Sequence, residues 1–138
     1  MRTLWLAPYN IHLEPIISGL GTIRKVDTVI HWLDQHGSPC DRAILDAADR
    51  ESPDLIVYTG ANGGPHVPTT ETLLRLRSYA PTVFMCHDAS DRTWLPYLEE
   101  YMARDVFTSI VSIDGNREWK HRPQDITALT PHDPRFYQ

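Results

Sequence analysis

The chain has 138 residues, of which 41% are hydrophobic and 22% are charged, a composition typical of one globular domain and not of a disordered chain. Its formal net charge is −5, and without a cluster of Lys or Arg this charge argues against a surface that binds nucleic acid. No apolar stretch approaches the roughly 20 residues that cross a bilayer, the N-terminal apolar run is too short for a signal peptide, and two cysteines without metal-type spacing favour a reduced, cytoplasmic protein.

Strands and helices alternate along the chain. We expect strands, in chain order, over residues 3–7, 26–32, 55–58, 82–86, 107–113 and 125–129, although residues 30–33 fit a helix equally well. We expect helices within residues 9–21, 38–52, 70–79 and 93–104. Short connections between such elements predict right-handed crossovers and a mostly parallel sheet of five or six strands. The predicted fold class is therefore α/β, a three-layer Rossmann-like domain over residues 1–129, with residues 130–138 as a turn-rich tail that resembles the start of an interdomain linker.

Local signals support several of these boundaries. Ser38, which precedes a proline, suits the cap of the second helix, and Thr69 or Thr70 suits the cap of the third. Cys86 ends an apolar strand and is expected to be a small buried hydrophobic residue. Large side chains near the fourth helix fall at packing spacing and are expected in the core or at an interface: Trp94, Leu95, Leu98 and Met102.

The most informative stretch is a short apolar strand that stops at a glycine-rich turn and leads into a helix. Leu55–Tyr58 is continuously apolar, as expected of a strand buried on both faces. The glycines that follow permit backbone angles and close approaches that a Cβ atom would forbid. Ligands of open parallel sheets bind at the carboxyl ends of the strands. This loop is therefore the first candidate binding site, and His66 is expected to be exposed in it; the candidate residues are Asn62, Gly63, Gly64 and His66.

A second polar cluster, His87-Asp88-Ala-Ser90-Asp91, follows the predicted strand over residues 82–86. A histidine beside a carboxylate can act as a base, because the carboxylate fixes the tautomer and raises the basicity of the imidazole. The alternative is that Asp88, Ser90 or Asp91 caps the next helix. A helix cap uses only one of these side chains, so the others could still form a site and both interpretations can hold.

Three further polar residues fall at the same predicted edge. His12 lies in the loop after the first strand, where a structural or solvent-facing role is favoured over a site role, and Asp114 and Asn116 end the fifth strand either as a tight turn or as part of a site. Imidazole and carboxylate ligands could hold a divalent ion, but no metal-type spacing supports one. The chain has no dinucleotide fingerprint, no Walker loop and no nucleophile elbow, so we expect no cofactor and no metal.

Taken together, the motifs at the strand ends resemble the amino-terminal half of a GT-B glycosyltransferase, closest to the family 4 and CgeB-like proteins. In chain order these motifs are Pro53-Asp54-Leu-Ile-Val-Tyr58, the glycine–histidine loop, Pro81-Thr-Val-Phe-Met-Cys-His-Asp88, Ile110-Val-Ser-Ile-Asp114 and Leu129-Thr-Pro-His-Asp-Pro-Arg-Phe136. They are short, and together they span most of the chain.

The resemblance implies an acceptor-binding Rossmann domain whose crevice is formed by the loops after the first, third and fourth strands. It places catalytic contacts on His87 and Asp88, and further acceptor contacts on His12, Asn62 and His66. Members of the family bind the nucleotide-sugar through a second Rossmann domain, and this chain ends where that domain begins. The implied partners are therefore a nucleotide-sugar-binding domain or subunit and a sugar acceptor, and we expect no sugar transfer by this chain alone.

Two other classes of function stay open. A non-catalytic, flavodoxin-like binding or protein-interaction module could use the same crevice, and the missing phosphate fingerprint favours it. A surface apolar patch with Trp94, Tyr97 and Tyr101 would then mark the partner face, and a homodimer is one form of that partner. The third class is a small hydrolase or nucleotide-processing enzyme that uses Asp88, Asp91 and Asp114 around a divalent ion.

Overall fold

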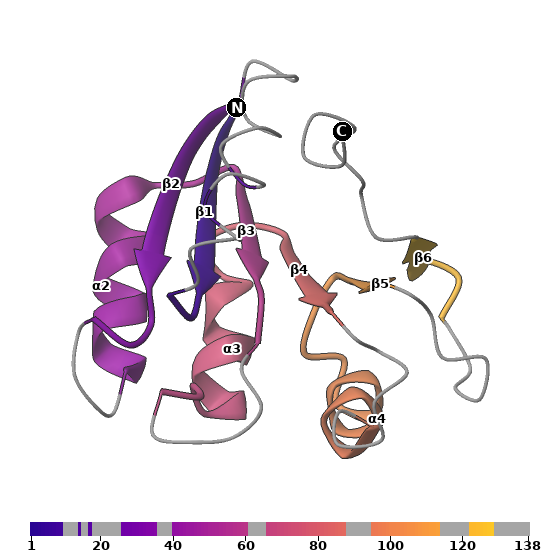
Figure 1. Cartoon of the computed structure of the whole chain (residues 1–138). Coiled ribbons are helices and arrows are strands. Elements are labelled where there is room, and N and C mark those ends of the chain that lie inside the picture. The colour runs from indigo at the N-terminus through magenta and orange to yellow at the C-terminus, as the bar shows by residue number, and fades with distance from the viewer. Residues whose placement is uncertain are drawn as a thin grey trace, which may run out of the picture.

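The computed structural model describes residues 1–9, 14, 17, 26–35, 40–60, 66–87, 95–113 and 122–128. The elements in chain order are β1 (Arg2–Ala7), β2 (Asp27–Trp32), α2 (Asp41–Glu51), β3 (Leu55–Tyr58), α3 (Thr70–Leu76), β4 (Thr82–Cys86), α4 (Leu95–Ala103), β5 (Ser109–Ile113) and β6 (Ile126–Ala128). All six predicted strands are present in these ranges. Figure 1 shows α2 and α3 side by side along the sheet, with α4 seen nearly end-on.

The strands form one sheet in the order β2-β1-β3-β4-β5-β6, and each neighbouring pair is parallel. The α/β fold is therefore the Rossmann-like one that the alternation of elements predicts. Because β1 connects to β2 on one side and β3 lies on its other side, the direction of winding reverses between β1 and β3. In doubly wound sheets this switch point opens a crevice at the carboxyl ends of the strands.

The helix boundaries differ from the prediction in two places. The cap of α2 is Cys40 and not Ser38, which lies outside the described residues, and Cys40 makes no side-chain capping bond. Ser52 ends α2 in the left-handed region, with φ of 44°. The side chain of Thr69 caps α3 by accepting a hydrogen bond from the N–H of Thr72, as predicted. Helix α3 ends at Leu76 and not at residue 79, because the next three N–H groups bond three residues back and tighten the last turn.

The larger part of the core lies between the sheet and the described helices. Alternate strand residues meet α2, α3 and α4 there, and an aromatic cluster joins α4 to β3 and β4. Its rings lie 5.2 to 5.9 Å apart and belong to Tyr58, Phe84, Tyr101 and Phe107. Tyr101 is only 3% exposed, so the predicted surface patch is wrong for this residue, whose ring packs into the core. Cys86 is buried as predicted.

A smaller cluster covers the opposite face of the sheet. Trp5, Ala7 and Val57 alternate along β1 and β3 with the residues of the larger core, and they pack with Ile17. Ile17 is fully buried; Glu14 and Ile17 are the two described residues between residues 10 and 25, and both are helical. A right-handed β1–β2 crossover runs on the face opposite to α2, α3 and α4, because it moves along the sheet in the other direction. Ile17 therefore marks the third layer.

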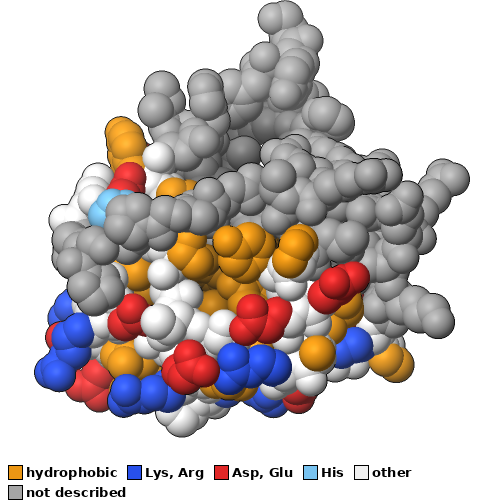
Figure 2. All heavy atoms as spheres, turned by 90° about the horizontal axis from the view of Figure 1, so that it is seen from below, with side chains coloured by type: hydrophobic (Ala, Val, Ile, Leu, Met, Phe, Trp, Pro, Cys, Tyr) orange, Lys and Arg blue, Asp and Glu red, His pale blue; other side chains and the backbone are white. Residues whose placement is uncertain are grey.

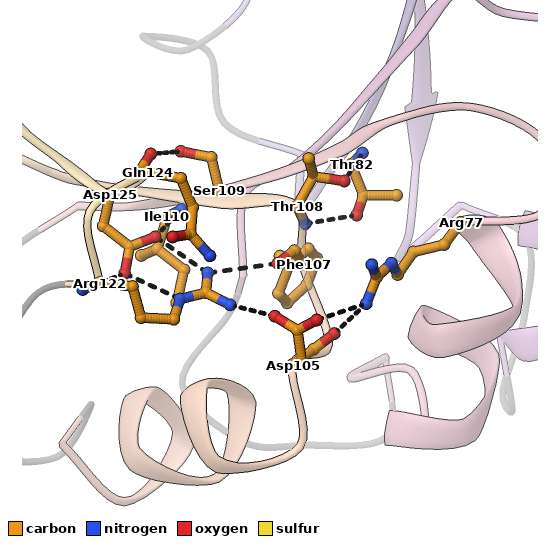
Figure 3. Close-up of polar contacts among 10 residues, drawn as sticks. All are labelled: Arg77, Thr82, Asp105, Phe107, Thr108, Ser109, Ile110, Arg122, Gln124 and Asp125. Carbon is orange, nitrogen blue, oxygen red and sulfur yellow. Dashed lines mark hydrogen bonds and ion pairs between the residues drawn. The ribbon is translucent and has the colours of Figure 1, made fainter.

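At the edge of the sheet where the strands begin, a polar network connects the starts of β4, β5 and β6 (Figure 3). The Asp125 carboxylate accepts hydrogen bonds from the Arg122 side chain at 2.9 and 3.0 Å and from the Ile110 N–H at 2.8 Å. Arg122 also pairs with Asp105 at 2.5 Å, and Asp105 pairs with Arg77 at 3.2 Å. The network therefore joins α3, the α4–β5 turn and the start of β6.

Among the described helices, none combines the length and the apolar character that crossing a membrane would require.

Candidate functional site

The carboxyl ends of β1, β2 and β3 point downward in Figure 1, and Figure 2 looks onto that edge of the molecule. Hydrophobic side chains gather at the centre of this view, and charged side chains line its lower rim. Strand pairing shows why the loops meet here: Leu6 of β1 lies beside Tyr58 of β3, and Tyr58 lies beside Phe84 of β4. The segments that follow β1, β3 and β4 therefore leave the sheet at the same edge.

Hydrogen bonds fix the backbone just beyond the strand ends. The N–H of Thr59 donates to the carbonyl of Leu6 at 2.8 Å, which extends the β1–β3 pairing by one bond. On the other side of β1, the N–H of Tyr9 donates to the Asp34 carboxylate at 2.9 Å. The ring of Tyr9 packs edge-to-face with Trp32 at 5.3 Å. The backbone of Thr59 and Tyr9, just beyond the strands, is therefore held by hydrogen bonds in addition to those within the strands.

The β3–α3 connection is anchored to the start of α2. Asp41 accepts from the N–H of Thr69 at 2.9 Å and from its hydroxyl at 2.7 Å. Partial burial is the largest influence on the pKa of Asp41 and raises it, but hydrogen bonds from Thr72 and Thr69 outweigh it and lower the pKa below its usual value. The thiol of Cys40 donates to the carbonyl of His66 at 3.3 Å. Burial raises the pKa of this thiol, as does the nearby Asp41 charge, so Cys40 anchors the loop and is not an activated nucleophile.

Two polar atoms on this connection lack the hydrogen bonds that buried polar atoms normally have. Within the described part of the chain, neither the hydroxyl of Thr59 nor Nδ1 of His66 has a partner, although both atoms are buried. Thr59 is only 4% exposed. An unpaired buried hydroxyl costs about 1–3 kcal/mol, so its retention at a strand end calls for a reason such as a bound ligand group.

The row of side chains around Thr59 follows from the register. Side chains alternate along a strand, so Thr59 shares a face of the sheet with Val57, the face that Ile17 covers. Continued by one residue beyond the Leu6–Tyr58 pair, the β1–β3 register puts Ala7 beside Thr59, and Trp32 lies beside Ala7 on β2. The three side chains form one row across the switch point, with the small methyl of Ala7 between an aromatic ring and a hydroxyl group.

We expect the replacement Thr59→Val to leave the free energy of unfolding unchanged or to raise it by up to about 1 kcal/mol, because it removes an unpaired buried hydroxyl at nearly constant volume. Urea denaturation followed by circular dichroism measures the change. Thr59→Ala is the matched control, since the loss of the methyl group should destabilise the protein. A loss of more than about 1 kcal/mol in the valine variant would mean that the hydroxyl has a structural partner.

Of the site residues predicted from the sequence, the structure describes His66 and His87. His66 is partly buried, contrary to the exposed position expected of it. His87 is partly buried and directly follows β4, at the same edge as the end of β3. Thr59 and Tyr9 are the residues that the prediction missed. The other predicted site residues lie outside the described residues: His12, Asn62, Gly63, Gly64, Asp88, Asp91 and Asp114.

The described residues contain no group of three or more His, Cys, Asp or Glu side chains placed to hold a metal ion. The acidic residues of the divalent-ion hypothesis lie outside the described ranges, so that hypothesis stays a prediction. Searches with the sequence against family models and curated proteins, and with the structure against solved structures, found no match.

Proposed function

We propose that this chain is the acceptor-binding half of a glycosyltransferase and that it transfers sugar only together with a donor-binding domain or subunit. The observation that carries the proposal is the parallel register of β3 and β4. This register brings the start of the glycine–histidine loop and the start of the His87-Asp88 motif to one edge, beside the switch point where such sheets bind ligands. Thr59, with its buried and unpaired hydroxyl, lies at the same edge.

The chemistry needs a base near the acceptor. The acceptor oxygen forms a bond to the anomeric carbon of the donor sugar, the bond from that carbon to the nucleoside diphosphate breaks, and the acceptor proton passes to a base. In this proposal the imidazole of His87 takes the proton, and the neighbouring carboxylate of Asp88 orients the ring and stabilises its cationic form. Positive charge that develops on the sugar is stabilised by the fixed dipoles and charges of the closed site.

The proposal is tested by reconstitution. The purified chain is titrated with UDP-glucose and with GDP-mannose in a calorimeter, first alone and then with the product of a neighbouring reading frame that encodes a second Rossmann domain. We expect no heat of binding with the chain alone and a saturable signal with the pair. If the chain alone bound the nucleotide-sugars as tightly as the pair does, donor binding would not belong to the second domain. A complex that binds no nucleotide-sugar would contradict the proposed function.

A second candidate, a non-catalytic binding module, is favoured by one observation. The first five strands have the order β2-β1-β3-β4-β5, which is the flavodoxin-like order, and flavodoxin-like folds bind their ligand at the β1–β3 switch point. Titration with FMN and size-exclusion chromatography separate the two candidates. A stable dimer, or a complex with FMN, without a response to any nucleotide-sugar would select the binding module.

A further inference from the structure

Tyr9 is an aromatic side chain that is both exposed and held in place at the carboxyl edge of the sheet. It is 49% exposed, although it directly follows the buried strand β1 and Pro8. Its N–H is bonded to Asp34, and its ring contacts Trp32 with an interplanar angle of 79°. In an edge-to-face pair, whichever ring supplies the edge, Trp32 leaves at least one face of the Tyr9 ring uncovered. The edge therefore presents a preorganised aromatic face.

We propose that Tyr9 is the stacking platform of an acceptor subsite and that the acceptor is a pyranose glycoside. This inference rests on the proposed function and names its acceptor class. A pyranose ring has an apolar face of C–H groups that packs on an aromatic ring, and hydroxyl groups at its rim that need hydrogen-bond partners. A tyrosine suits this task because it offers a large rigid surface at a small cost in conformational entropy.

One charged group borders this subsite. The Asp34 carboxylate already accepts the N–H of Tyr9, and it lies at an exposed position from which its second oxygen can accept from a sugar hydroxyl. An open-chain polyol would satisfy such hydroxyl partners as well as a glycoside does, but it would not stack. Stacking is therefore the property that the experiment isolates.

The experiment is an NMR titration of the isotope-labelled 138-residue chain with methyl β-D-glucopyranoside, with sorbitol as the open-chain probe. Signals of the Tyr9 ring and the Trp32 indole are assigned by Tyr9→Phe and Trp32→Phe. We expect both signals to shift with the glycoside, with a dissociation constant in the millimolar range, and not with sorbitol. Tyr9→Phe should bind within about twofold of the wild type, whereas Tyr9→Ala should bind about five- to tenfold more weakly.

Tyr79→Ala is the matched control, because Tyr79 is also an exposed tyrosine (38%) but follows the C-terminus of α3. Urea denaturation of every variant shows that it is folded. The inference is overturned if about 50 mM glycoside, well above a millimolar dissociation constant, shifts neither signal, or if Tyr9→Ala binds as well as Tyr79→Ala. Transfer by the reconstituted pair with an acceptor KM that Tyr9→Ala does not raise would overturn the subsite and leave the function. Binding of the glycoside without sugar transfer by the reconstituted pair would leave the subsite and overturn the proposed function.

Discussion

Asp125→Ala is expected to lower the free energy of unfolding by about 3 kcal/mol, the largest stability change that we expect from a single polar side chain among the described residues. The Asp125 side chain is fully buried, and that of Arg122 is 17% exposed. Removing the carboxylate leaves the guanidinium of Arg122 with Asp105 and the carbonyl of Phe107, and it deprives the N–H groups of Ile110 and Arg122 of their acceptor. A buried group that loses its partner costs more than the original bond contributed.

Urea denaturation measures this loss, with the midpoint and the slope fitted separately so that a change in cooperativity is recognised. Asp125→Asn keeps the shape of the side chain and an acceptor for Ile110 but not the charge, so it should cost about half as much. Asp46→Ala is the matched surface control, because Asp46 pairs with Arg42 in an exposed i,i+4 contact, and it should cost less than about 0.5 kcal/mol. Equal effects of Asp125→Ala and Asp46→Ala would show that the network does not hold β6.

The same carboxylate sets part of the pH dependence. Burial is the largest influence on the pKa of Asp125 and raises it, but hydrogen bonds from Arg122 and from the N–H groups of Ile110 and Arg122 outweigh burial, so the pKa lies below its usual value of 3.8. Such a group stabilises the folded state fully above its unfolded pKa. Its contribution is lost as the pH falls from about 3.8 through the lower folded pKa. Asp125→Asn should therefore flatten the fall in stability over that range.

The fold could be predicted because its signals are local. The apolar run Leu55–Tyr58 needs no knowledge of its neighbours to be recognised as a buried strand, and the prediction matches β3 residue for residue. The sequence alone does not predict the end of a strand or helix where a contact with a distant residue decides it. The strand expected from residue 107 begins at Ser109, because Phe107 is committed to the aromatic cluster and its carbonyl accepts from Arg122.

The candidate site could be predicted only in part. The sequence indicates His87 because a polar cluster after an apolar strand is visible in one dimension. It does not indicate Thr59, whose significance is a missing hydrogen bond, or Tyr9, whose significance is a contact with Trp32 across two strands. Both depend on the strand order β2-β1-β3. Alternation of strands and helices predicts a parallel sheet but does not say which strand lies next to which.

Replacing His87 and Asp88 together is expected to give the largest change in activity. In the reconstituted pair, His87→Gln with Asp88→Asn should lower kcat for sugar transfer by about 10²- to 10⁴-fold, the usual contribution of general acid–base catalysis. The acceptor KM should change little, since the amide side chains keep the size of the originals. His87→Gln alone should remove most of the rate, because Asp88 acts through the imidazole and the two losses are not additive.

A change in pH distinguishes a catalytic base from a structural histidine at this position. If His87 accepts the acceptor proton, kcat/KM should fall as the pH drops below the pKa of the imidazole, and this limb should vanish in His87→Gln. Asp49→Asn, an exposed change on α2, is the control and should leave the profile intact. His87 directly follows β4, at the carboxyl end of the strand, where ligands of such sheets bind. At this position the orientation of the imidazole ring matters more than its packing. Transfer at the wild-type rate by the double variant would remove His87 and Asp88 from the mechanism, and the base would then have to come from another loop of the same edge.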